Sequence, residues 1–215
     1  MVIIQHCIKG IGGIDRNVAM SLLASGITCN WWRKVNPLPN REIPVRLNDR
    51  NLEWHQNRYI DPDPLEGNEP FGRHTPFISV TAGTVERDAV WRCNLIHPAW
   101  QVALEFATDG WSRDGYLFYC YLFILSRPSV HHPGFSEEKR DLNVYTGFSP
   151  FQPEGEITAK IIIPPTQIQR FEFFDIAQVR RDFAAGQIPT PRYTEASSDY
   201  YQPPEEIANI RTFLV

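Results

Sequence analysis

Two carboxylates, Glu154 and Glu156, stand two positions apart where a loop becomes a strand. The loop runs from Phe151 to Gly155, and an apolar, β-branched segment follows it up to Ile163. Side chains at positions i and i+2 of a strand point to the same face, so the two acids are expected to lie side by side. Like charges at close range raise each other's pKa, which is unfavourable unless a cationic group uses them. The pair is therefore the first candidate for a catalytic site.

This segment also carries a family resemblance. Glu154-Gly155-Glu156, followed after six residues by Ile163-Pro164, resembles the catalytic segment of the ADP-ribosyltransferase toxins of the cholera and heat-labile enterotoxin type. Upstream, Tyr145 to Pro150 is similar to the aromatic-Ser-Pro approach to that segment. The resemblance covers residues 145–168 well, and the rest of the chain through two short motifs.

The two short motifs lie upstream, in the order that this family has. Trp31-Trp32-Arg33 resembles the aromatic-Arg piece at the end of a first strand, and Phe77 to Thr81 resembles a Ser-Thr-Ser strand. Both depart from the family pattern, because Val80 stands where a hydroxyl is usual and no Gly/Ala-Asp follows Arg33. Ser79 still matches the first Ser of the motif.

The resemblance implies transfer of ADP-ribose from NAD, as co-substrate, to a protein side chain. This reaction breaks the bond between nicotinamide and ribose through a transition state like an oxocarbenium ion, as in glycoside hydrolysis. Glu156 is implied to bind the ribose 2′-hydroxyl and to face the developing positive charge, with Ser79 orienting it. Glu154 is implied to orient an arginine acceptor or to take its proton.

Further residues are implied to bind the two substrates. Arg33 would hold the diphosphate of NAD, because a guanidinium matches phosphate oxygens and keeps its charge. Thr81 joins Ser79 at the NAD site, and His74 is a weaker candidate for a ribose or phosphate contact. Phe148 and Phe151, in the loop before Glu154, would grip the protein target. Taken alone, His74 and the two aromatics are more often structural than functional.

Composition bounds the fold and excludes several classes. With 215 residues and 42% hydrophobic content, the chain suits one domain. We expect residues 1–215 to form it, with a core of about 27–186 and a Pro-rich tail, 187–215, packed on that core. The net charge of −4 arises from 21 basic and 25 acidic residues without a long run of either sign, so nucleic acid is a disfavoured partner. The four cysteines form no Cys-x-x-Cys pair, so no metal is expected.

The N-terminal sequence and the hydropathy bear on location. The start of the chain has no basic n-region and no long apolar stretch, so no signal peptide is expected. No segment approaches the ~18 continuous apolar residues of a membrane span. We expect a cytoplasmic protein as made, delivered into another cell by a non-classical route if it is exported. Its partner would be a protein target, with an immunity or carrier protein as a further partner to consider.

Periodicity and breakers predict the following elements. A helix is expected at 15–25, capped by Asp15 and ended by Gly26, and others at 47–57, 85–94, 98–108, 176–185 and 205–210. Strands are expected at 27–35, 76–81, 116–125, 142–145, 156–163 and 169–174, with 116–125 buried on both faces. The long polar stretch 36–76 is expected to be functional or draped over a binding cleft.

Three other features are given structural interpretations. Gly10-Ile11-Gly12-Gly13 is interpreted as a turn, because Asp15 stands where a dinucleotide fingerprint needs its third glycine. His131-His132 is interpreted as solvated loop, and Cys120 as a buried thiol unsuited to a hydrolase.

The predicted fold is α+β, of the ADP-ribosyltransferase type, with two small antiparallel or mixed sheets flanked by helices around an NAD cleft. The leading functional hypothesis is a mono-ADP-ribosyltransferase that acts on arginine, as a toxin or effector. Two alternatives stay open: an NAD glycohydrolase, in which water is the acceptor, and a non-catalytic relative that only binds a partner.

Overall fold

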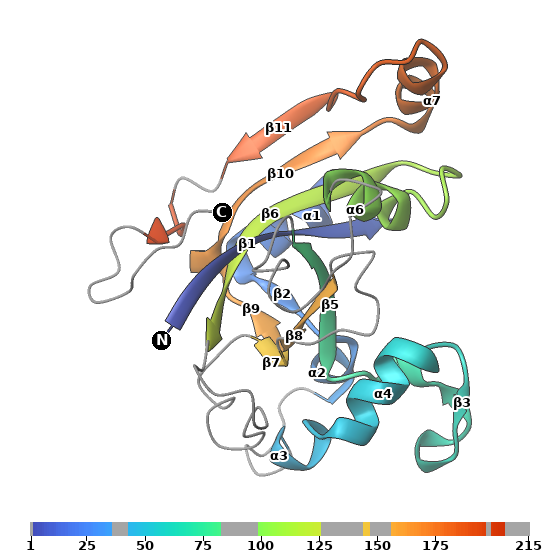
Figure 1. Ribbon diagram of the computed structural model, residues 1–215, viewed down its shortest axis with the longest axis vertical. Helices are drawn as coiled ribbons and strands as arrows, with labels where there is room; N and C mark the ends of the chain where they lie inside the picture. Colours follow the sequence, from blue (N-terminus) through green and yellow to red (C-terminus); the bar gives the residue numbers. More distant parts are fainter. Residues whose placement is uncertain are drawn as a thin grey trace, which may run out of the picture.

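A seven-stranded antiparallel sheet dominates the computed structural model, with the strand order β11-β10-β6-β1-β5-β8-β7 (Figure 1). The structure describes residues 2–35, 43–82, 99–125, 144–146, 156–196 and 199–204. Its strands are β1 (Val2–Gly12), β5 (Phe77–Ala82), β6 (Gly115–Leu125), β7 (Val144–Thr146), β8 (Glu156–Lys160), β10 (Ile168–Phe174) and β11 (Tyr193–Ala196). The predicted α+β class with antiparallel pairing is confirmed.

The helices and the short strands complete the described part of the chain. The helices are α1 (Arg16–Ser25), α2 (Asn30–Val35), α3 (Ile43–Arg46), α4 (Asp49–Asn57), α6 (Ala99–Ala107) and α7 (Ile176–Ala184). Two-stranded ladders join β2 (Ile27–Thr28) to β9 (Ile162–Ile163) and β3 (Pro62–Asp63) to β4 (Glu69–Pro70). Within these ranges, no helix is long and apolar enough to span a bilayer.

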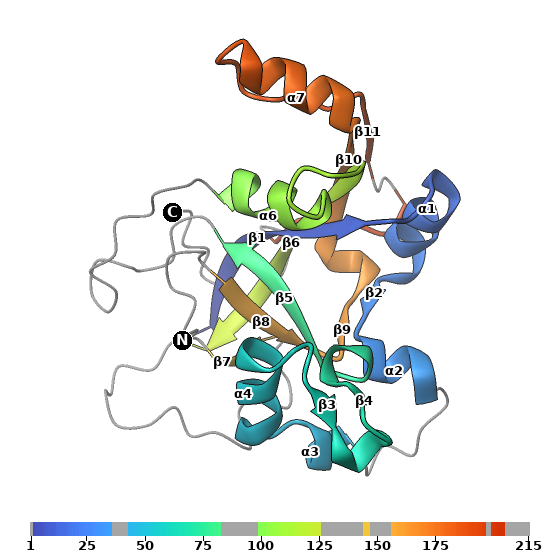
Figure 2. The ribbon, with the colours of Figure 1, turned by 90° about the vertical axis from the view of Figure 1, so that its right-hand side faces the viewer.

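The main sheet has two halves with a narrow junction. β1 pairs with β6 along its whole length, from Val2↔Leu125 to Gly12↔Gly115. On its other side, β1 pairs with β5 at Cys7↔Ala82 and Ile8↔Thr81, and no pairing continues from there to Gly12 among the described residues. The two strands diverge beyond this junction, as Figure 2 shows. The strands expected in two small sheets are thus joined in one hydrogen-bonded sheet that opens into halves.

Strand β6 lies between β10 and β1 and is buried on both faces, as predicted. Phe118, Cys120 and Leu122 belong to the larger core beneath α1 and α2, whereas Leu117 packs with α6 and α7 on the opposite face. Cys120 is 4% exposed, and burial raises the pKa of its cross-strand neighbour Cys7, so both thiols lie in the interior.

The glycine run interpreted as a turn belongs largely to strand β1, and that interpretation was wrong. A Cβ on Gly10 would lie 2.1 Å from the Ala103 carbonyl oxygen, and one on Gly12 would lie 2.0 Å from that of Ala107. The glycines therefore let α6 pack directly on the backbone of β1. Only Gly13, with φ +70°, starts the turn into α1.

Local signals located most other elements. The Asp15 side chain accepts a hydrogen bond from the Val18 amide, and the helix ends at Gly26, as predicted. The prediction of a strand at 27–35 was wrong. Strand β2 is short because it pairs with only the two residues of β9, and helix α2 follows it. Ile161, with φ +61°, interrupts the strand expected at 156–163. Strand β11 was not predicted. The expected helices at 85–94 and 205–210, and His131-His132, lie outside the described residues.

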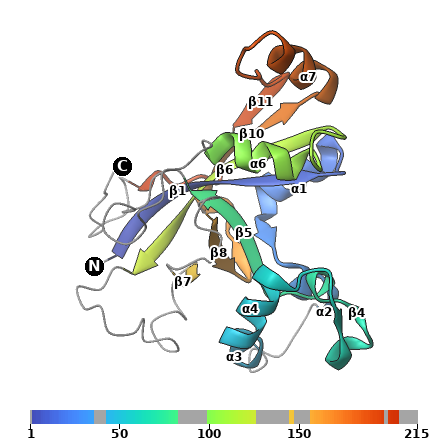
Figure 3. The same cartoon turned by 45° about the vertical axis from the view of Figure 1, so that its right-hand side comes forward.

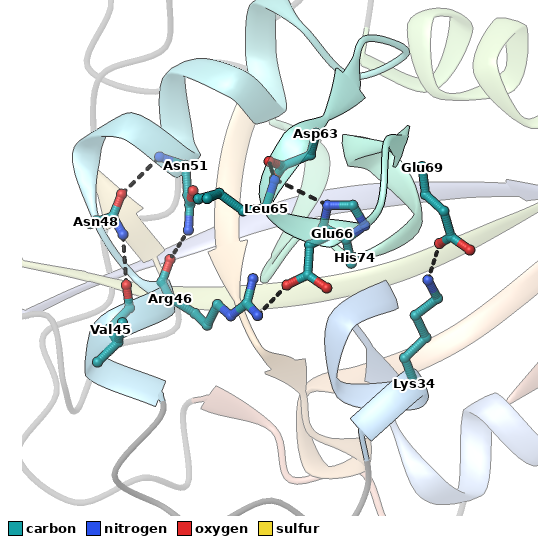
Figure 4. Close-up of polar contacts among 10 residues, drawn as sticks. All are labelled: Lys34, Val45, Arg46, Asn48, Asn51, Asp63, Leu65, Glu66, Glu69 and His74. Carbon is teal, nitrogen blue, oxygen red and sulfur yellow. Dashed lines mark hydrogen bonds and ion pairs between the residues drawn. The ribbon is translucent and has the colours of Figure 1, made fainter.

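A lobe made of α3, α4, β3 and β4 extends below the sheet (Figure 3). Figure 4 shows its polar ties: Arg46 pairs with Glu66, and Asp63 accepts from the Leu65 amide and contacts His74. Asn48 caps α4 by accepting from the Asn51 amide. Lys34 of α2 pairs with Glu69 of β4, which links the lobe to the body.

Candidate functional site

A cavity of about 560 Å³ opens where β1 and β5 diverge. Its walls come from the end of β1, from β5, from α1 and from α4, and Glu156 and Arg33 also line it. The stretch 36–76, predicted to be functional or draped over a cleft, contributes His55, Gln56 and Tyr59 to this wall. The volume lies within the range of small-molecule sites.

Glu156 enters the cavity from the first residue of β8 and is 9% exposed. In the sheet register Thr81 of β5 lies opposite Glu156, and Ile8 of β1 lies opposite Thr81. The acid therefore belongs to a row that crosses three neighbouring strands beside the junction. Ser79, predicted to orient Glu156, lies two register pairs away, opposite Thr158.

A cation that the sequence analysis missed, Lys9 of β1, also lines the cavity. Burial lowers the pKa of Lys9 to about 8, while the nearby Glu156 carboxylate acts to raise it and Arg33 to lower it. The ammonium is therefore mostly charged at neutral pH. The sequence signal for it was the lysine between Ile8 and Gly10 in a largely apolar run, since such a charge is rarely buried without a partner.

Arg33 reaches the same cavity, but from helix α2 and not from the end of a strand. Helical spacing buries Trp31 at 1% exposure and leaves Arg33 exposed at the rim. The Arg33 guanidinium donates to the Asn30 side-chain carbonyl oxygen, which holds it beside the opening. The cavity thus has one partly buried and one exposed basic side chain, Lys9 and Arg33, among its described lining residues.

His55 is a second residue that the sequence analysis missed. Its Nε2 lies 2.8 Å from Ser79 Oγ and its Nδ1 lies 2.8 Å from Thr75 Oγ1. Burial lowers the pKa of His55 to about 3, and the Lys9 charge lowers it further in the same direction. The imidazole is therefore neutral at physiological pH, with one ring nitrogen donating and the other accepting. Only the fold shows this contact, because α4 and β5 are far apart in sequence.

The remaining predicted site residues have different positions. Thr81 lines the cavity, whereas His74 is absent from its lining and is 1% exposed, with Nε2 3.3 Å from Asp63 Oδ2. Glu154, Phe148 and Phe151 lie outside the described residues, so their roles stay predictions. No group of three His, Cys, Asp or Glu side chains suited to a metal occurs in the described ranges.

Comparison with known proteins gives matches among solved structures alone. No protein-family model matches the chain, and no curated protein matches it. EcPltA matches at 14% identity and a TM-score of 0.44, over 93% of this chain and 88% of that one. The catalytic domain of the mosquitocidal toxin from Bacillus sphaericus matches at 12% identity and a TM-score of 0.36, over 80% of this chain and 51% of that one. This chain is thus similar in structure to EcPltA and to the catalytic domain of the mosquitocidal toxin.

Proposed function

We propose that this protein cleaves the nicotinamide–ribose bond of NAD and transfers ADP-ribose to an arginine side chain of a protein target, as a toxin or effector does. The observation that carries the proposal is the buried Glu156, at a strand start inside a cavity that also holds Lys9 and Arg33. An acid beside two cations suits a ligand that has a diphosphate and a centre where positive charge develops.

The residues of the cavity fit NAD. Its volume of about 560 Å³ suits a dinucleotide that extends partly beyond the opening. Lys9 and Arg33 supply the positive charge for the diphosphate, with Arg33 offering a planar fork of donors. The apolar residues of α1 and the end of β1 in the lining, among them Ile14, Val18 and Leu22, suit an uncharged base.

Glu156 would act electrostatically. When the bond to nicotinamide breaks, positive charge develops on the ribose, and a carboxylate already fixed beside it stabilises that charge without reorganisation. Lys9 balances the acid before the reaction, since the two side chains interact in the low-dielectric interior. The positive charge that moves from the nicotinamide ring to the ribose in the transition state would then meet a negative group that the backbone of β8 holds in place.

Ser79 and His55 would position the site. The Ser79 hydroxyl is held by a neutral imidazole that is fixed on its other side by Thr75. This chain of hydrogen bonds ties α4 to β5 beside the strand that carries Glu156. We assign His55 a positioning role, since its lowered pKa makes it a poor proton acceptor at neutral pH.

The test is incubation of the protein with NAD labelled in its adenylate part, with and without a host lysate. We expect nicotinamide release together with labelled protein, and mass spectrometry to place the label on arginine. Release without labelling would indicate an NAD glycohydrolase, and neither would indicate a binding module.

Two Glu variants sharpen the test. Glu156→Gln keeps the side-chain shape and is expected to reduce nicotinamide release about 100- to 1,000-fold, whereas Glu154→Gln should spare hydrolysis and abolish transfer to arginine. Glu53→Gln, on the exposed surface of α4, is the matched control and should retain both activities. Full NAD cleavage by Glu156→Gln would overturn the proposed mechanism.

A further inference from the structure

A second pocket, of about 320 Å³, lies between α6, α7 and the turn that joins α6 to β6. Its described lining consists of Gln101, Trp111, Arg180 and Phe183, and we call it the α7 pocket. None of these residues belongs to the lining of the cavity that holds Glu156. Helix α7 stands between β10 and β11 in the chain, and Figure 1 shows it at the outer end of this strand pair. The proposed reaction assigns no role to this part of the molecule.

The backbone of Trp111 has a conformation that is unfavourable for its side chain. Its φ is +69°, and the two residues before it, Asp109 and Gly110, have φ values of +52° and +61°. The left-handed region favours glycine, and a bulky residue is rarely found there. Such strain persists only where surrounding contacts enforce it, and it is concentrated at functional sites. The position of the indole ring therefore requires an explanation.

Contacts on both sides hold the indole in this position. The Trp111 amide donates to Thr108 Oγ1 at 3.1 Å. Arg180 of α7 donates to the Trp111 carbonyl oxygen through Nε at 3.2 Å and through Nη2 at 2.6 Å. The Phe183 ring meets the Trp111 ring edge-on, with centroids 5.0 Å apart and an interplanar angle of 85°. An aromatic side chain that is fixed in advance loses little conformational entropy when a partner binds it.

The pocket combines apolar surface with one positive charge. Phe183 keeps 38% of its surface exposed, and Trp111 is half-buried. Arg180 is exposed, and its bonds to Trp111 use Nε and Nη2, so its Nη1 group is available for a further acceptor. The described lining contains this cation and no carboxylate. Charge complementarity therefore favours a partner that presents an apolar side chain next to a carboxylate. Aromatic and arginine side chains are also the types that dominate binding energy at protein interfaces.

The α7 pocket lies close to the mouth of the cavity. Helix α6 contributes Gln101 to the pocket and Phe106, which is 65% exposed, to the cavity lining. Arg113, two residues after Trp111, packs over Gly12 at the cavity, where a Cβ would lie 3.1 Å from Arg113 Nε. Figure 1 shows α7 and the end of β1 on the same side of the molecule. A protein bound at the α7 pocket is therefore able to reach into the cavity.

We propose that the α7 pocket is an exosite for the protein acceptor. A segment of the acceptor with an apolar side chain next to a carboxylate docks there while an arginine of the same protein enters the cavity. This inference rests on the proposed function, and it adds what the acceptor must present. Free arginine has no such segment, so the exosite increases transfer to proteins and leaves transfer to free arginine unchanged.

Labelling of two acceptors tests the proposal. Each variant receives NAD labelled in its adenylate part, with either host lysate proteins or free arginine as acceptor. We expect Phe183→Ala to lower protein labelling roughly 5- to 30-fold. Transfer to free arginine and release of nicotinamide should change less than about twofold. Tyr200→Ala is the matched control and should retain protein labelling, because Tyr200 is 52% exposed and belongs to neither lining.

A second variant separates a binding role of the indole from a structural one. Trp111→Gly removes the ring and suits the φ of +69°. We expect the same selective loss of protein labelling, with a urea midpoint close to that of the wild type, because relief of strain offsets the lost contact with Phe183. A purely structural Trp111 would instead give lower stability with unchanged labelling by the folded protein. Should Trp111→Gly fail to fold, Phe183→Ala decides.

Salt tests the carboxylate of the partner. The ratio of protein labelling to free-arginine transfer removes the effect of salt on NAD binding, since both reactions use NAD. In the wild type this ratio should fall as ionic strength rises from about 0.01 to 0.15 M. Arg180→Gln should lower the ratio and remove its salt dependence, while Arg180→Lys, which keeps the charge, should retain the salt dependence. An unchanged salt dependence in Arg180→Gln would overturn the carboxylate assignment.

The outcomes separate the exosite from the proposed function. Unchanged protein labelling by Phe183→Ala, or equal loss with both acceptors, would overturn the exosite. Transfer to free arginine without labelling of proteins would do the same. So would a wild-type dimer in sedimentation that Phe183→Ala dissociates, since a second copy would then occupy the pocket. If the wild type transfers to neither acceptor, the proposed function itself fails, whatever the α7 pocket does.

Discussion

The two halves of the main sheet differ in how far their strands pair and in which side chains cover their faces. In the half with β10, β6 and β1, strands pair over long registers and apolar side chains cover both faces. In the half with β5 and β8, one face of β8 is apolar through Ile157 and Ala159, while the other carries the buried polar residues Glu156, Thr158 and Lys160. The first half serves as a scaffold, and the second carries the candidate functional residue Glu156 at the cavity.

The junction explains how the two coexist. Full pairing of β1 with β5 would bring strand backbones about 5 Å apart and close the cavity. Since pairing stops at Ile8↔Thr81, the end of β1 stays on β6 while β5 turns away with the lobe. The buried Glu156 therefore faces an open cavity and not a closed core.

The largest effect is expected from a change in the scaffold. Phe118 is fully buried and packs against Phe171, with ring centroids 5.4 Å apart. Phe118→Ala should lower the free energy of unfolding by about 3–5 kcal/mol, measured by urea denaturation. NAD affinity of the folded protein should stay unchanged. Weaker NAD binding with stability intact would break the division between the two halves.

Acid should destabilise the functional half through His55. The pKa of His55 in the folded protein is about 3, below the ordinary value of 6.5. Between these two pH values, His55 is therefore protonated in the unfolded chain and neutral in the folded chain. Stability should fall as pH decreases from about 6.5 toward 3, and not above 6.5. Urea denaturation across this range checks it. A His55→Gln variant should show a flatter profile, and an unchanged slope would assign the effect to other groups.

Base should weaken NAD binding through Lys9, by up to about tenfold. The ammonium loses its proton as pH rises through about 8, and with it the charge offered to a diphosphate. Because the folded pKa lies below the ordinary 10.5, this group's contribution to folding stability rises over the same pH range. Affinity and stability should thus change in opposite directions. Lys9→Arg should bind NAD with little pH dependence, and a wild-type-like decline in that variant would contradict the assignment.

The smallest effect is expected at the tie between the lobe and the body. The Lys34–Glu69 pair is exposed, with 44% of each side chain accessible. Exposed ion pairs contribute about 0–1 kcal/mol, so Lys34→Ala should change the free energy of unfolding by no more than this. NAD KM should remain within about twofold. A larger rise in KM would mean that this exposed pair sets the position of the lobe.

Local sequence signals predicted the elements whose causes are local. Asp15 and Gly26 marked the ends of α1, and the apolar run around Phe118 marked a central strand, because capping and two-sided burial depend on neighbouring residues. Local signals gave the wrong secondary structure where contact with an element distant in sequence determines it. The glycines of β1 were predicted to form a turn. They are needed because α6 packs closely on the strand, and this contact cannot be inferred from neighbouring residues.

The candidate site divides in the same way. From residue type and order alone, the sequence predicted that Glu156, Ser79, Thr81 and Arg33 share one site, and all four line the same cavity. Only the tertiary structure brought Lys9, His55 and Tyr59 to the same cavity. The physical reason is that their contacts join β1, α4 and β5 across long stretches of chain, and such contacts leave no periodic pattern in the sequence.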